Sequence, residues 1–150
     1  MLQAEKWDQR FMELAAHVAT WSKDPSTKTG AVIVRHDRTI AAVGYNGFPR
    51  GMSDYPHWYE DRNTKLSRII HCEMNAIMSC QDANHSGYTL YTFPFSSCDR
   101  CFVHMVQWGI VRFVYNEPMK WEGDFEKVKQ YAKEMGVGLC ELDIFNSKST

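Results

Sequence analysis

The sequence predicts a single α/β domain in which helices sandwich a mixed five-stranded sheet, and two observations support this fold class. The chain has 150 residues, 44% of them hydrophobic and 23% charged, which is enough for one hydrophobic core and typical of a globular domain. In its second half, strand patterns alternate with amphipathic helix patterns. This alternation favours crossover connections between parallel strands, so we treat residues 1–150 as one domain.

The first half is expected to begin with a helix and a hairpin. Residues 3–21 carry apolar residues at helical spacing, and SKDPSTKTG (22–30) interrupts that pattern with loop-forming residues. Two apolar runs around a polar HDR predict a β-hairpin over 31–46. Residues 47–67 are polar, aromatic and turn-rich, and a connection of this length is expected to be functional.

The second half is expected to alternate helices with strands. Each segment either repeats its apolar residues at helical spacing or reads as a short apolar strand. The expected elements are a helix over 71–81, a strand over 88–93, a helix over 98–109, a strand over 110–115, a helix over 124–136 that stops at Gly136, and a strand over 137–145.

Charge and composition exclude several classes of protein. The net charge is −1 with no basic run, which argues against broad nucleic-acid binding but allows a small anionic ligand. No apolar stretch approaches the roughly 20 residues of a membrane span, and MLQAEKWDQRF has no signal-peptide core. We expect a cytoplasmic protein with no membrane partner. In such a reducing compartment the five cysteines indicate metal or redox chemistry rather than disulfides.

Four residues predict a catalytic zinc site. Cys98-x-x-Cys101 places two thiols on the first turn of a predicted helix, where the helix N-terminus favours thiolates. His71, at the start of another predicted helix, is the natural third ligand, and three protein ligands leave one position of a tetrahedral Zn2+ open for water. Glu73 can then act as the proton shuttle. A histidine at a helix start or a C-x-x-C pair is, by itself, more often structural. The combination of H-x-E followed by C-x-x-C, however, is the signature of zinc nucleobase deaminases.

Longer motifs carry a narrower resemblance. SKDPSTKTGAVIV, VGYNGFPRG, HCEMNAI and the C-x-x-C followed by IVRFVY resemble the cytidine deaminase superfamily, and within it the deoxycytidylate (dCMP) deaminases, over a core of about 5–142. The resemblance implies a three-layer α/β/α fold and hydrolytic deamination of dCMP to dUMP, with zinc-activated water attacking C4 and Glu73 moving the proton. It also implies a homohexamer, activated by dCTP and inhibited by dTTP, with Mg2+ beside the effector.

The chain departs from the family pattern at two positions. Cys72 stands where the family has a small residue, and we expect it to pack away from the metal as a small hydrophobe. Ser97 stands where the family has proline, so we expect the loop facing the leaving amine to differ.

Other residues are candidates for nucleotide contacts. Ser22 and Lys28 belong to the predicted 22–30 loop and offer donors for a phosphate, although such residues also build solvated turns. The resemblance implies that Asn46 contacts the sugar or base; a turn role is its alternative. Tyr115 ends a predicted strand and either lines the pocket or packs in the core. The expected effector contacts are Arg50, Asn63 and Lys65.

Two alternatives to a dCMP deaminase remain open. One is another deaminase of the superfamily, acting on tRNA adenosine or on free cytosine or cytidine, although the near-neutral charge argues against the tRNA substrate. The other is a non-catalytic zinc-binding module. Such a module would have no use for Glu73 beside an open metal position.

Overall fold

Strand β1 (Gly30–Val34) is buried along its whole length, so both faces of its sheet are covered. The computed structural model describes residues 5–120 and 124–146. The other strands are β2 (Ile40–Tyr45), β3 (Tyr88–Phe95), β4 (Ile110–Glu117) and β5 (Gly138–Glu141). The helices are α1 (Lys6–Ala19), α2 (Pro56–Glu60), α3 (Arg62–Arg68), α4 (Cys72–Ser79), α5 (Asp99–Trp108) and α6 (Asp124–Met135).

The five strands form one mixed sheet in the order β2-β1-β3-β4-β5. Strand β1 pairs antiparallel with β2 and β3, while β3, β4 and β5 run parallel. The parallel pairs need crossovers, which α5 and α6 supply. The predicted hairpin and mixed sheet are therefore confirmed.

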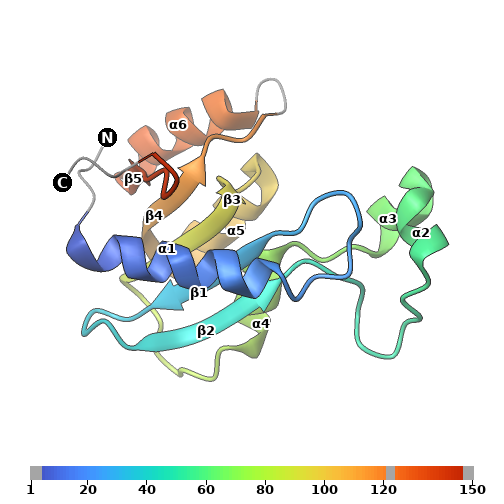
Figure 1. Cartoon of the computed structure of the whole chain (residues 1–150). Helices are drawn as coiled ribbons and strands as arrows, with labels where there is room; N and C mark the ends of the chain where they lie inside the picture. Colours follow the sequence, from blue (N-terminus) through green and yellow to red (C-terminus); the bar gives the residue numbers. More distant parts are fainter. Residues whose placement is uncertain (1–4, 121–123, 147–150) are drawn as a thin grey trace.

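Alternate residues of the strands feed two cores on opposite faces of the sheet (Figure 1). Val32 of β1 packs with Phe11 and Met12 of α1 on one face. Ile33 belongs to the other core, where α4, α5 and α6 cover the sheet, as Phe102 of α5 illustrates. This arrangement confirms the predicted three-layer α/β/α domain.

Helix α4 packs directly on β2 because Gly44 has no side chain. A Cβ at this position would lie 2.4 Å from the backbone nitrogen of Ala76 and 2.4 Å from the carbonyl oxygen of Cys72. The Asn75 side chain also donates to the carbonyl oxygen of Tyr45 at 2.8 Å. These contacts place the start of α4 beside the end of β2.

The boundaries of several predicted elements differ in the structure. The first helix is shorter than predicted, and positions 3 and 4 of that prediction lie outside the described residues. Gly136 stops α6 with φ +68°, as predicted. The last strand ends at Glu141 rather than 145, because Asp143 accepts from the Phe145 N–H and turns the chain.

The connection predicted over 47–67 contains two helices that the sequence analysis did not assign. Pro56 occupies the first turn of α2, and the Asp61 side chain caps α3 by accepting from the Thr64 N–H. Backbone hydrogen bonds between Gly47 and Ile70, 2.8 and 3.2 Å long, close the connection at its base. We call residues 48–69 the arm; in Figure 1 its helices project away from the sheet. Within the described part of the chain, no helix is long and apolar enough to cross a membrane.

Candidate active site

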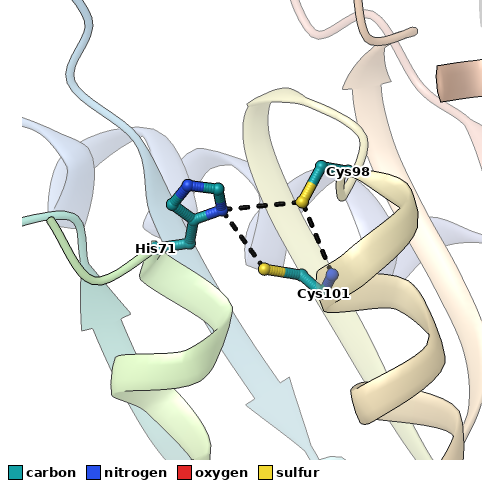
Figure 2. A group of neighbouring side chains, drawn as sticks. All are labelled: His71, Cys98 and Cys101. Atoms are coloured by element: carbon teal, nitrogen blue, oxygen red, sulfur yellow. Dashed lines mark hydrogen bonds between the residues drawn. The ribbon is translucent and has the colours of Figure 1, made fainter. Parts of the chain in front are cut away.

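The predicted metal ligands lie at the starts of two helices that face each other (Figure 2). His71 is the N-cap of α4 and Cys98 is the N-cap of α5, with Cys101 in the first turn after it. The His71 carbonyl accepts from Asn75 N–H at 3.0 Å, and the Cys101 N–H donates to Cys98 Sγ at 3.4 Å. Helix capping therefore fixes the backbone of all three residues.

The three side chains match the requirements of a zinc site. His71 Nδ1 lies 3.2 Å from Cys101 Sγ and 3.6 Å from Cys98 Sγ, and all three donor atoms lie within 4.8 Å of one another. In a tetrahedral site, Zn–N and Zn–S bonds of about 2.0 and 2.3 Å separate nitrogen from sulfur by about 3.6 Å. Among the described residues no fourth histidine, cysteine or acid joins this group. The donor set therefore fits zinc with one position open.

The three side chains are close enough to shift one another's pKa. A hydrogen bond with the Cys101 thiol, together with one to His71, lowers the pKa of Cys98 to about 4. The same proximity raises the pKa of Cys101, and the contact with Cys98 raises the pKa of His71. A zinc ion held by His71, Cys98 and Cys101 would displace the protons of the thiols, because metal ligands must be deprotonated.

Glu73 lies in the first turn of α4 and is only 4% exposed. It lines a cavity of about 320 Å³ whose wall also includes His71 and Cys98. Cys72 packs in the core as expected and takes no part in the ligand cluster. Burial raises the pKa of the Cys72 thiol, which therefore stays protonated and donates to Glu73 Oε1 at 3.6 Å. The geometry places a buried carboxylate and two of the three predicted metal ligands at one cavity.

The four residues predicted to contact the nucleotide occupy different places. Asn46 lines the cavity, but its side chain also accepts from the Thr29 N–H at 2.8 Å and donates to the Thr27 carbonyl at 2.9 Å. Ser22 is buried behind the loop and Lys28 is exposed. Neither belongs to the cavity wall.

Of the other four predicted residues, one lines the cavity and three lie outside its wall. Tyr115 is 1% exposed and packs in the core, away from the cavity wall. Arg50 and Asn63 are exposed on the arm and are not part of the wall either. Lys65, in contrast, lines the same cavity as Glu73.

Several residues of the cavity wall were not among the predicted site residues; they include Asp24, Arg62 and Ser96. Arg62 lies three residues before Lys65 on α3, so the two share one helix face. Recognising Asp61 as an N-cap would have revealed this pair, since Asp is one of the preferred residues at that position. Asp24 carried no signal because an acid is not expected in an anion-binding loop.

Comparisons with known proteins agree with this geometry. Residues 5–117 match the family model described as the cytidine and deoxycytidylate deaminase zinc-binding region. An uncharacterized deaminase of Aliivibrio fischeri is 41% identical over 106 residues, which are 70% of this chain and 69% of that protein. The deoxycytidylate deaminase of Mus musculus is 36% identical over 115 residues, 73% of this chain and 64% of that protein. The chain thus spans about two thirds of the length of these relatives.

A solved structure shares the fold. The dCMP deaminase of cyanophage S-TIM5, crystallised with dCMP and dUMP, superposes with a TM-score of 0.75 at 20% identity. The superposition covers 93% of this chain and 98% of that chain.

Proposed function

Because the chain belongs to the cytidine and deoxycytidylate deaminase family, we propose that it hydrolyses dCMP to dUMP and ammonia, with Glu73 as the proton shuttle. The observation that carries this proposal is the shared cavity: the buried Glu73 carboxylate lines the same space as His71 and Cys98 of the ligand cluster. The names of the relatives support the substrate, since the mouse protein is a deoxycytidylate deaminase and the cyanophage enzyme binds dCMP and dUMP.

The site residues have two separate roles, which are zinc binding and proton transfer. A zinc ion held by His71, Cys98 and Cys101 would supply a Lewis acid that activates the attacking water. Glu73 removes a proton from that water and delivers it to N3 of the cytosine ring while C4 is attacked. The same carboxylate then takes the proton of the new C4 hydroxyl and transfers it to the amine, so that the C4–N bond breaks, the C4 carbonyl forms, and one water is consumed as ammonia leaves.

The site geometry favours a catalyst over a non-catalytic zinc module. A structural zinc site closes its coordination with a fourth protein ligand, whereas the described residues provide three. Burying Glu73 is costly, and a module that used zinc only to hold its fold would gain nothing from that cost.

Regulation and assembly stay predictions that come from the resemblance. They comprise activation by dCTP, inhibition by dTTP with Mg2+, a homohexamer and a cytoplasmic location. Arg50 and Asn63 remain candidates for effector contacts on the exposed arm. Lys65 lies at the cavity of Glu73, so we assign it to the substrate instead.

Substitution of Glu73 tests the proposal. Glu73→Gln and Glu73→Ala should retain zinc, measured by elemental analysis, and should retain the circular dichroism spectrum of the fold. Deamination of dCMP, followed by loss of cytosine absorbance, should fall by about 10²–10⁴-fold, the usual contribution of a general acid-base. Glu126→Gln is the matched control, because Glu126 lies on the solvent side of α6 with its side chain 76% exposed. Retained deamination in both Glu73 variants would refute the mechanism.

A substrate panel tests the reaction itself. Wild-type protein loaded with zinc should deaminate dCMP in preference to deoxycytidine, cytosine and dCTP. A preference for free cytosine or cytidine would instead support another branch of the superfamily.

A further inference from the structure

The arm contributes the arginine and the lysine of the cavity wall. Arg62 and Lys65 both come from α3, and both line the cavity that contains Glu73. The base of the arm lies immediately before His71, where Ile70 pairs with Gly47. A group bound by α3 is therefore held at a defined place relative to the candidate metal ligands.

Asp24 fixes the position of Lys65. The Lys65 Nζ lies 2.8 Å from Asp24 Oδ2 and donates to Ser26 Oγ at 2.9 Å. Asp24 is 1% exposed, and its other oxygen accepts from the Ser26 N–H at 2.9 Å. Asn46 also donates to Asp24 Oδ2, at 3.2 Å. Because protein donors occupy both oxygens, Asp24 holds the wall together and is not itself open to a ligand.

The protonation of Asp24 agrees with this role. Burial alone would raise its pKa, but hydrogen bonds from Lys65 and Ser26 outweigh burial and hold the pKa below its ordinary value. The carboxylate is thus charged at neutral pH and keeps the ammonium of Lys65 oriented.

Arg62 and Lys65 both retain capacity to bind an anion. Two of the three N–H donors of Lys65 have acceptors within the described chain, which leaves the third for a ligand. Arg62 is exposed, and its guanidinium forms no ion pair among residues 5–120 and 124–146. Guanidinium and ammonium groups together match a phosphate group, whose charge is about −2 at neutral pH.

We propose that α3 forms the subsite for the 5′-phosphate of the substrate, with Arg62 and Lys65 as specificity-determining contacts and Asp24 as the positioning residue for Lys65. This inference rests on the proposed function for the identity of the nucleotide. It assigns discrimination between a nucleoside monophosphate and a nucleoside to the arm. It also replaces Ser22 and Lys28, which the structure leaves outside the cavity wall.

Binding and turnover measured side by side test the proposal. Calorimetric titration with dUMP and with 2′-deoxyuridine gives the phosphate contribution without any catalysis, and kcat/KM for dCMP and deoxycytidine gives it during turnover. Arg62→Ala and Lys65→Ala should each reduce the preference for the monophosphate by about 10- to 100-fold in both assays, the usual effect of losing a charge-assisted hydrogen bond. Lys65→Arg should restore most of that preference.

Two further variants separate positioning from damage to the fold. Asp24→Asn should lower the monophosphate preference about as much as Lys65→Ala, and the double variant should be no worse than Lys65→Ala alone. Arg68→Ala is the matched control on the same helix. Arg68 lies over the Trp58 ring at 4.2 Å and outside the cavity wall, so its variant should keep the wild-type preference.

The outcomes distinguish this inference from the proposed function. If Arg62→Ala and Lys65→Ala weaken dUMP and 2′-deoxyuridine equally, the subsite lies elsewhere and the inference is wrong. If wild-type protein deaminates no cytosine substrate, the proposed function fails, while the titrations with dUMP and 2′-deoxyuridine still decide whether α3 binds a phosphate. If Asp24→Asn unfolds the protein, the Lys65 and Arg62 variants still test whether α3 binds the phosphate.

Discussion

Gly44→Ala should damage the candidate site without touching a site residue. The added Cβ would lie 2.4 Å from two backbone atoms of α4, whereas ordinary van der Waals contact begins near 3.4 Å. Helix α4 must therefore move by about 1 Å, because backbone atoms cannot rotate aside as a flexible side chain can. His71 and Glu73 belong to the start of that helix and move with it.

The expected losses of stability and of rate follow from this displacement of α4. Overpacking of a buried contact costs about 1–3 kcal/mol, which lowers the Tm of a 150-residue protein by about 2–12 °C. A catalytic group displaced by about 1 Å loses on the order of 10²-fold in rate. We therefore expect kcat/KM for dCMP to fall about 100-fold while most of the fold survives.

Calorimetry measures the change in Tm, and the absorbance assay for dCMP measures the change in kcat/KM. Gly47→Ala is the matched control, because a Cβ there would meet no atom within 4 Å. It should therefore keep the wild-type Tm. If Gly44→Ala kept both the wild-type Tm and the wild-type rate, the close approach of α4 to β2 would not position the site as we describe.

Two further predictions concern buried polar groups. Asp8 is fully buried and accepts two hydrogen bonds from Arg112, at 2.6 and 2.8 Å, and one from the Tyr91 hydroxyl at 2.6 Å. Burial would raise the pKa of Asp8, but these hydrogen bonds hold it below the ordinary 3.8. The stability they add is therefore complete above about pH 5 and is lost as the pH falls through the folded-state pKa. Asp8→Asn should cost about 3–5 kcal/mol at pH 7 and a smaller amount in acid, measured by denaturant unfolding across pH; a constant difference would contradict the linkage. Ser97 Oγ is buried with no hydrogen-bond partner among the described residues, so Ser97→Ala should stabilise the fold by about 1 kcal/mol, whereas Ser96→Ala, which removes the acceptor of a 2.8 Å bond, should destabilise it. Destabilisation by Ser97→Ala in thermal unfolding would show that its hydroxyl is paired.

Local patterns were sufficient for most of the fold. Helical periodicity located α1 and α6, and strand patterns located all five strands, because each pattern reflects which faces of an element are buried. The short helices α2 and α3 were not predicted. Pro56 in the first turn of α2 and the N-cap Asp61 of α3 carry the signal, but segments of five and seven residues are too short to show an amphipathic period.

Residue type and spacing were also sufficient for the candidate metal ligands. His71, Cys98 and Cys101 belong to short motifs at helix starts, and the donor chemistry of those residue types is the same in any fold. The predicted nucleotide contacts stay predictions, and the structure separates them into different places. Ser22, Lys28 and Tyr115 have suitable side chains, yet the structure places them outside the cavity wall.

The sequence alone thus determined the fold class and singled out the candidate ligand set and Glu73, because these depend on chemistry and periodicity over a few neighbouring residues. Only the tertiary structure decided which polar residues face the cavity. Lys65 meets Asp24, 41 positions earlier in the chain, because the arm folds back onto the 22–29 loop. Loop closure at Gly47 and Ile70 and the packing of α4 on Gly44 create that proximity, and neither leaves a periodic trace in the sequence.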